Sequence, residues 1–191
     1  MKVAVFGDSF AASQDPVSWT RQSNWDVDNF ATNGSSEYRI LKTLKDTDIS
    51  RYDLIIVVHT SANRIYVPQN PLYKNHDTHS NCDLIYLDMY SKPDSEYRDH
   101  VVWWFENVFD LDSAQHMHEL LIKESLELTK HKRSIHLTFF ENLHKDVFCL
   151  YNVWQQNLGN VNHLNLQGNQ LVADFIKDKY EKTILHGLGK L

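Results

Sequence analysis

Three runs of mainly apolar and β-branched residues are spread along the chain, and each is as long as one buried strand. They are Lys2–Phe6, Leu54–His59 and Ser134–Phe140, and a fourth, more polar strand is predicted around Val27–Ala31. Continuous apolar runs suit strands that are covered on both faces, which is the condition of a parallel sheet flanked by helices. We therefore expect an α/β fold, a three-layer sandwich with a mostly parallel central sheet.

Helical patterns lie between and after these strands, and we interpret their apolar stripes as core packing. Ser36 is expected to cap a helix, and Ser113 is expected to cap a second one. The stripes share one helix face each. Their members are Ile40, Leu41 and Leu44 in the first helix, Ala114, Met117, Leu120, Leu121 and Leu128 in the second, and Leu171, Val172, Phe175, Ile176 and Tyr180 in the last.

Residues 65–112 do not follow this alternation and hold three of the four prolines. Because 191 residues suffice for one substantial core and are few for two, we expect one domain over 1–191, with this segment as an insertion. Long insertions in α/β folds tend to shape the ligand site, which predicts a lid or pocket wall. Alternatively, the aromatic residues from Trp103 to Phe109 form a short helix that closes the core or contacts another subunit.

Net charge, hydropathy and cysteine content limit the binding partners and the compartment that we expect for the chain. The chain has 19 basic and 25 acidic residues, and its formal charge of −6 repels a nucleic-acid backbone. Apolar runs are all far shorter than the roughly 18–20 residues that cross a bilayer, and the N-terminus has no signal-like apolar core. Cys82 and Cys149 fit a reducing compartment, although one bridge stays possible. We expect a cytoplasmic protein with no nucleic-acid partner and no membrane span.

A serine lies directly behind the first predicted strand, in Gly7-Asp8-Ser9-Phe10. Such residues also make ordinary turns. A serine hydroxyl becomes a nucleophile when an imidazole lies within hydrogen-bond reach, and His163 precedes the last helical pattern. Ser9 and His163 are therefore predicted to form a catalytic pair.

Two further polar segments follow predicted strands, one containing Gly34 and the other Asn63. Together with Ser9 and His163, they make the chain resemble the SGNH hydrolase superfamily, or GDSL esterases and lipases, over nearly its whole length. The resemblance implies an SGNH or flavodoxin-like sheet, Ser9 as nucleophile and His163 as general base. It also implies an oxyanion hole built from Ser9, Gly34 and Asn63, and no cofactor. Fixed donors of this kind are worth about 10²–10³ in rate each.

The chain departs from this family at the residue that should orient the histidine. The family usually has Asp three residues before the His, and here Asn160 stands there; no carboxylate lies between Asp146 and His163. In a serine protease, changing the triad Asp to Asn lowers turnover about 10⁴-fold. Three outcomes are open: Asn160 or a backbone carbonyl orients His163, a carboxylate from a distant segment replaces the Asp, or the protein is slow or inactive.

These residues predict a serine-dependent hydrolase of carboxylic esters, an esterase or deacylase acting on a small-molecule or carbohydrate ester. An acyltransferase would use the same groups. The alternative is an inactive SGNH-fold protein that binds a carbohydrate or protein partner, in which Gly34 is only a turn glycine, Asn63 caps a loop and His163 satisfies a buried carbonyl. His76, His79 and Cys82, with His116 and His118, have spacing that transition metals accept, but no second ligand pair accompanies them, and we predict no metal.

Overall fold

The computed structural model describes residues 1–13, 15–22, 24–70, 72, 82–85, 96–141, 144–159 and 163–188, the last six of them in the backbone only. A five-stranded sheet forms its centre, in the order β2-β1-β3-β6-β7, and every strand pair is parallel. The strands are β1 (Lys2–Phe6), β2 (Asp26–Asn29), β3 (Leu54–His59), β6 (Ser134–Thr138) and β7 (Phe148–Cys149). The predicted α/β class is confirmed.

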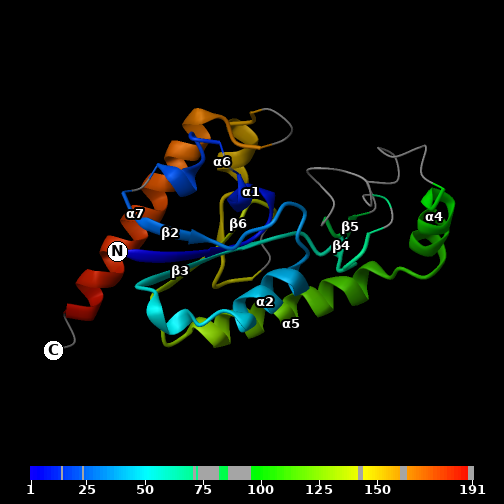
Figure 1. The fold of residues 1–191 in the computed structure, drawn as a ribbon, viewed down its shortest axis with the longest axis horizontal. Coiled ribbons are helices and arrows are strands. Elements are labelled where there is room, and N and C mark those ends of the chain that lie inside the picture. Colours follow the sequence, from blue (N-terminus) through cyan, green and yellow to red (C-terminus); the bar gives the residue numbers. More distant parts are fainter. Residues whose placement is uncertain are drawn as a thin grey trace.

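Helices cover both faces of this sheet, as Figure 1 shows. On one side lie α2 (Glu37–Asp46) and α5 (Leu111–Thr129); on the other lie α1 (Ser9–Ala12), α6 (Tyr151–Gln156) and α7 (Leu166–Leu188). Successive residues of β1 enter different cores: Val3 and Val5 pack with α7 residues, whereas Ala4 and Phe6 pack with α2 residues. Both cores need apolar side chains, which explains why the strand sequence does not alternate.

The order of the strands reverses direction between β1 and β3. The chain passes from β1 to β2 on one side, and then from β2 across to β3 on the other side of β1. The loops that follow β1 and β3 therefore diverge, and ligands of open α/β sheets bind beyond the carboxyl ends of strands at such a point. Short 3₁₀ turns, Trp19–Arg21 and Ile49–Arg51, complete the connections.

The predicted start of α2 is confirmed, and the predicted start of α5 is wrong. Ser36 Oγ accepts a hydrogen bond from the backbone N–H of Arg39 at the beginning of α2. Helix α5 is capped by Asp110, whose carboxylate accepts from the N–H of Ser113 at 2.7 Å, so Ser113 lies inside the first turn. A carboxylate cap also complements the positive end of the helix dipole.

The predicted inward face of α5 is also wrong. Met117, Leu120 and Leu128 are exposed, and the buried residues of the helix are His118, Ile122, Ser125 and Thr129. These four share one face, but three of them are polar, so apolar spacing indicated the wrong side. His118 and Thr129 bond to Thr60 and His136 beneath the helix, and Ser125 Oγ donates to Leu121 O of α5 itself. In α7, Val172 and Ile176 are buried as predicted, whereas Leu171 is exposed.

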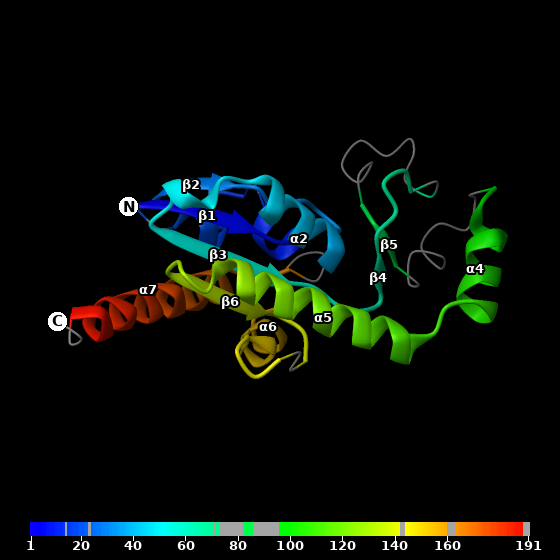
Figure 2. The same cartoon turned by 90° about the horizontal axis from the view of Figure 1, so that it is seen from below.

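The insertion has its own small core. Its described elements are β4 (Arg64–Ile65), which pairs with β5 (Leu84–Ile85), and α4 (Arg98–Asn107). Figures 1 and 2 show these elements beyond the carboxyl ends of the strands, not across a face of the sheet. The aromatic segment does include a short helix, but its buried residues pack with those of the insertion, namely Leu72, Cys82, Leu84, Val101 and Phe105. None of the helices in the described ranges is both long and apolar enough to cross a membrane.

Candidate functional site

The turn after β1 presents Ser9 at the carboxyl end of the sheet. Asp8 caps the short helix α1, and its Oδ1 accepts from the N–H of Phe10 at 3.1 Å, so Ser9 becomes the first helical residue. Gly7 is required here, because a Cβ at this position would lie 2.7 Å from Cβ of Val58 in β3. The close approach of β3 thus decides where the serine stands.

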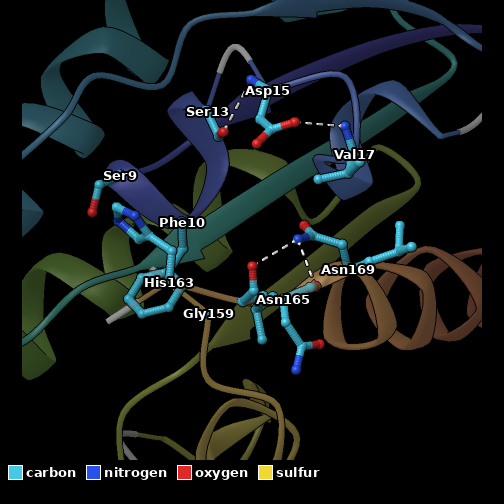
Figure 3. Close-up of a pocket in the computed structure, with 11 residues that line it drawn as sticks. Ser9, Phe10, Ser13, Asp15, Val17, Gly159, His163, Asn165 and Asn169 are labelled. Carbon is cyan, nitrogen blue, oxygen red and sulfur yellow. Dashed lines mark hydrogen bonds between the residues drawn. The ribbon is translucent and has the colours of Figure 1, made fainter. Parts of the chain in front are cut away.

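Ser9 and His163 line the same cavity, of about 520 Å³. Figure 3 shows the side chain of Ser9 beside the imidazole of His163, with Asn169 at the other end of the cavity. The ring of Phe10 packs edge-on against His163, with 5.5 Å between the ring centroids. The remaining lining residues are Ser13, Asp15, Val17, Gly159, Leu164, Asn165 and Leu166. The structure therefore brings together two residues that are 154 positions apart in the sequence.

A charged group in the turn that carries Ser9 acts on His163. Burial lowers the pKa of His163 below its usual value, and the negative charge of Asp8 opposes that shift. Burial raises the pKa of Asp8, and the opposing effects come first from the charge of Arg64 and then from the Phe10 N–H and the Thr60 hydroxyl. The Thr60 hydroxyl donates to Asp8 Oδ2 at 2.9 Å.

The electrostatic effect of Asp8 on His163 comes from the turn after β1, not from the segment that precedes His163. Asn160 lies outside the described residues, and no described residue hydrogen-bonds to the imidazole of His163. Asp8 belongs to the turn motif Gly7-Asp8-Ser9-Phe10, but its electrostatic effect on a histidine near the other end of the chain has no signal in the sequence.

Gly34 has the turn geometry that its residue type predicts. Its φ is +68°, and a side chain would overlap the sulfur of Cys82. The backbone of Thr32 ties this loop to the nucleophile turn by donating to Gly7 O at 3.0 Å. Within the described ranges, the N–H groups of Ser9 and Gly34 donate no hydrogen bond, but Gly34 is not among the residues that line the Ser9 cavity.

Asn63 is exposed and lines a different cavity. That cavity also measures about 520 Å³, and its walls include His118, Phe140 and Tyr151. The loop after β3 is nonetheless tied to the nucleophile turn through the bond between Thr60 and Asp8. The structure does not place Asn63 in the cavity of Ser9, and its role in the oxyanion hole stays a prediction.

A buried polar network beneath α2 and α5 has no counterpart in the sequence analysis. Glu37 Oε1 accepts from His59 Nδ1 at 2.7 Å, and Oε2 accepts from the N–H of Thr60 at 3.2 Å. His118 donates to Thr60 O at 2.9 Å and lies 3.5 Å from Glu37 Oε2. Two imidazoles and a backbone N–H thus surround one buried carboxylate.

The network continues from His59 toward β6 and α5. His59 Nε2 lies 2.9 Å from His136 Nδ1, and His136 Nε2 lies 2.8 Å from Thr129 Oγ1. Despite burial, His59 and His118 hold the pKa of Glu37 at about 2. Burial lowers the pKa of His136 to about 3. A glutamate that begins a helix and histidines within apolar strands are the signal that predicts such a network.

The histidines and cysteine whose spacing could suit a transition metal do not form a metal site in the described part of the chain. His76 and His79 lie outside the described residues, His118 binds Thr60 O, and Cys82 Sγ donates to Asn33 O at 3.3 Å. In the ranges that the structure covers, no three His, Cys, Asp or Glu residues gather as metal ligands would. Cys82 is buried and Cys149 exposed, and both are free thiols.

Comparison with known proteins assigns the chain to no family. Neither a protein-family model nor a curated protein matches its sequence.

Proposed function

We propose that the protein is a serine-dependent hydrolase of carboxylic esters. The observation that carries the proposal is the shared cavity of Ser9 and His163 at the carboxyl end of β1, with the charge of Asp8 acting on the imidazole. A lowered pKa keeps His163 neutral near pH 7, as a base that accepts the proton of a serine must be. A nucleophile and base on different elements of one scaffold are typical of acyl transfer.

In this mechanism His163 accepts the proton of Ser9 while Ser9 Oγ attacks the ester carbonyl carbon. Asp8 stabilises the imidazolium that forms, and the N–H of Ser9 donates to the oxyanion. The N–H of Gly34, which lies outside the cavity lining, is the second donor that the SGNH resemblance implies. His163 then returns the proton to the leaving alcohol, and an acyl-enzyme forms on Ser9. Water, deprotonated by His163, releases the acid and restores Ser9. The chain's own residues perform each of these proton transfers.

The size and lining of the cavity support a small-molecule or carbohydrate ester as the substrate. About 520 Å³ lies in the usual range for small ligands, and its lining combines Phe10 and Leu164 with the polar side chains of Asn165 and Asn169. We also propose a cytoplasmic location, which the two free thiols support.

Covalent labelling tests the proposal directly. A fluorophosphonate probe is expected to form one adduct, on Ser9, because only an activated hydroxyl attacks phosphorus at a useful rate; mass spectrometry of the digested protein locates it. His163→Gln removes the base and should slow labelling by about 10²–10⁴-fold. An unlabelled Ser9 in folded protein would refute the hydrolase and favour the binding protein on the same scaffold.

The role of Asp8 predicts a specific pH effect. Asp8→Asn removes the negative charge that raises the pKa of His163, so that pKa should fall further below its usual value. His163 is active when neutral, and the acid limb of kcat/KM should therefore move to lower pH. The maximal rate should fall about tenfold, less than in a directly bonded triad, because the imidazolium loses its counter-charge. An acid limb that stays in place, measured from pH 4 to 8, would remove Asp8 from the mechanism.

A further inference from the structure

Arg64, the first residue of β4, has an unpaired guanidinium. Its Nε is buried and has no hydrogen-bond partner, and no described residue forms an ion pair with it. Arg39 differs, because its Nε and Nη2 donate to the two carboxylate oxygens of Asp83 at 2.9 and 2.5 Å. Buried polar groups are almost always hydrogen-bonded, and leaving a donor of a charged group without an acceptor is destabilising.

The guanidinium of Arg64 lines a cavity of about 330 Å³ between the insertion and helices α2 and α5. We call it the Arg64 cavity, and it is separate from the cavity of Ser9. Most of the residues that line it are apolar, and they come from two parts of the structure. The insertion contributes Ile65, Trp104 and Phe109, and α5 contributes Ala114, Met117 and Leu121. Apolar walls with one or two converging polar groups are typical of small-molecule sites.

The other charged groups at this cavity already have partners. Both oxygens of Glu37 accept hydrogen bonds, from His59 and from the Thr60 N–H, and His118 donates to Thr60 O. Asp110 accepts from the N–H of Ser113 as the cap of α5. Arg64 is therefore the charged group of this wall whose donors face no acceptor within the described ranges.

We propose that the Arg64 cavity binds a small carboxylic acid with an apolar body. The carboxylate accepts two parallel hydrogen bonds from Arg64, whose planar fork matches it better than an ammonium would. The apolar body lies against Trp104, Phe109 and Met117, where burial of its surface adds affinity. Neither Ser9 nor His163 lines this cavity, so an inactive protein would retain the site.

Calorimetric titration of the full chain with octanoate and octanamide tests the site, since the two ligands share a body and differ in charge. Wild-type protein is expected to bind one octanoate, and octanamide at least about tenfold more weakly. Arg64→Gln should weaken octanoate at least tenfold and leave octanamide unchanged. Lys177→Gln is the matched control, because it removes an equal charge from the exposed surface of α7.

A second variant locates the binding. Ala114→Phe fills the Arg64 cavity without touching the guanidinium and should abolish binding of both ligands, while circular dichroism shows that the variant is folded. Absence of octanoate binding to wild-type protein at millimolar concentration would overturn the proposal. Binding that survives Ala114→Phe, or an equal loss in Arg64→Gln and Lys177→Gln, would overturn it as well.

Discussion

Ser9→Ala is expected to lower kcat for an activated short-chain ester by about 10³-fold or more, with the midpoint of thermal unfolding nearly unchanged. Alanine keeps the backbone N–H and the helix start but leaves no oxygen that can attack the carbonyl carbon. In serine hydrolases the loss of the nucleophile costs as much as the loss of the whole triad, because the groups act as one unit. Ser9 is half-buried and makes no side-chain bond to a described residue, so the fold loses little.

A second serine of the same cavity provides the control. Ser13 Oγ accepts from the N–H of Asp15 at 3.2 Å, and it is not placed beside His163. Ser13→Ala should therefore keep kcat within a few-fold of wild type. Full activity of Ser9→Ala would assign the reaction to another residue, and a parallel loss in both variants would point to damage of the cavity.

Glu37→Ala is expected to lower the free energy of unfolding by about 3–5 kcal/mol, the usual cost of removing one partner of a buried ion pair. The variant leaves His59 Nδ1 and the N–H of Thr60 without acceptors inside the protein, at positions that are completely buried. Urea denaturation at pH 7 measures the loss. Glu119→Ala is the matched control on exposed α5 surface, where the ion pair with Lys123 should contribute less than about 1 kcal/mol.

The same variant has a pH signature. The folded-state pKa of Glu37 is about 2, below its usual value of 4.5, so the unfolded chain binds the proton first as the pH falls. The stabilisation is fully present above pH 4.5 and is lost between there and pH 2. Wild-type protein should therefore lose stability more steeply in this window than Glu37→Ala. Parallel pH curves would show that Glu37 is not held as a carboxylate.

Sequence patterns predicted the sheet well where one physical requirement dominated. Residues of β1 and β3 pack into an apolar core on each face of the sheet. Both faces need apolar side chains, so these strands are continuously hydrophobic. The pattern failed on α5, where the buried face carries His118, Ser125 and Thr129. Polar groups can face a core only when they have hydrogen-bond partners. Ser125 bonds within α5, but the partners of His118 and Thr129 are Thr60, directly after β3, and His136 in β6, which local spacing does not reveal.

The candidate site divides in the same way. Residue type and position predicted Ser9 and His163 as a pair, and the fold places them in one cavity. Asn63, which the resemblance implies for the same site, lines another cavity. The effect of Asp8 on His163 required coordinates, because electrostatic interaction depends on distance and burial.

Residue order alone was enough to predict β1, β2, β3 and β6, the three-layer class and the turn that carries Ser9, because these depend on short-range preferences and on apolar runs that are buried on both faces. The short strands β4, β5 and β7 have no such run and were not predicted. Coordinates were needed to find that Asp8 acts on His163, that His59 of β3 and His118 of α5 lie against Glu37, and that Arg64 has no hydrogen-bond or ion-pair partner among the described residues. The interactions of Asp8 and Glu37 join side chains from distant segments of the chain. The energy of each interaction depends on a low-dielectric environment that exists only after folding.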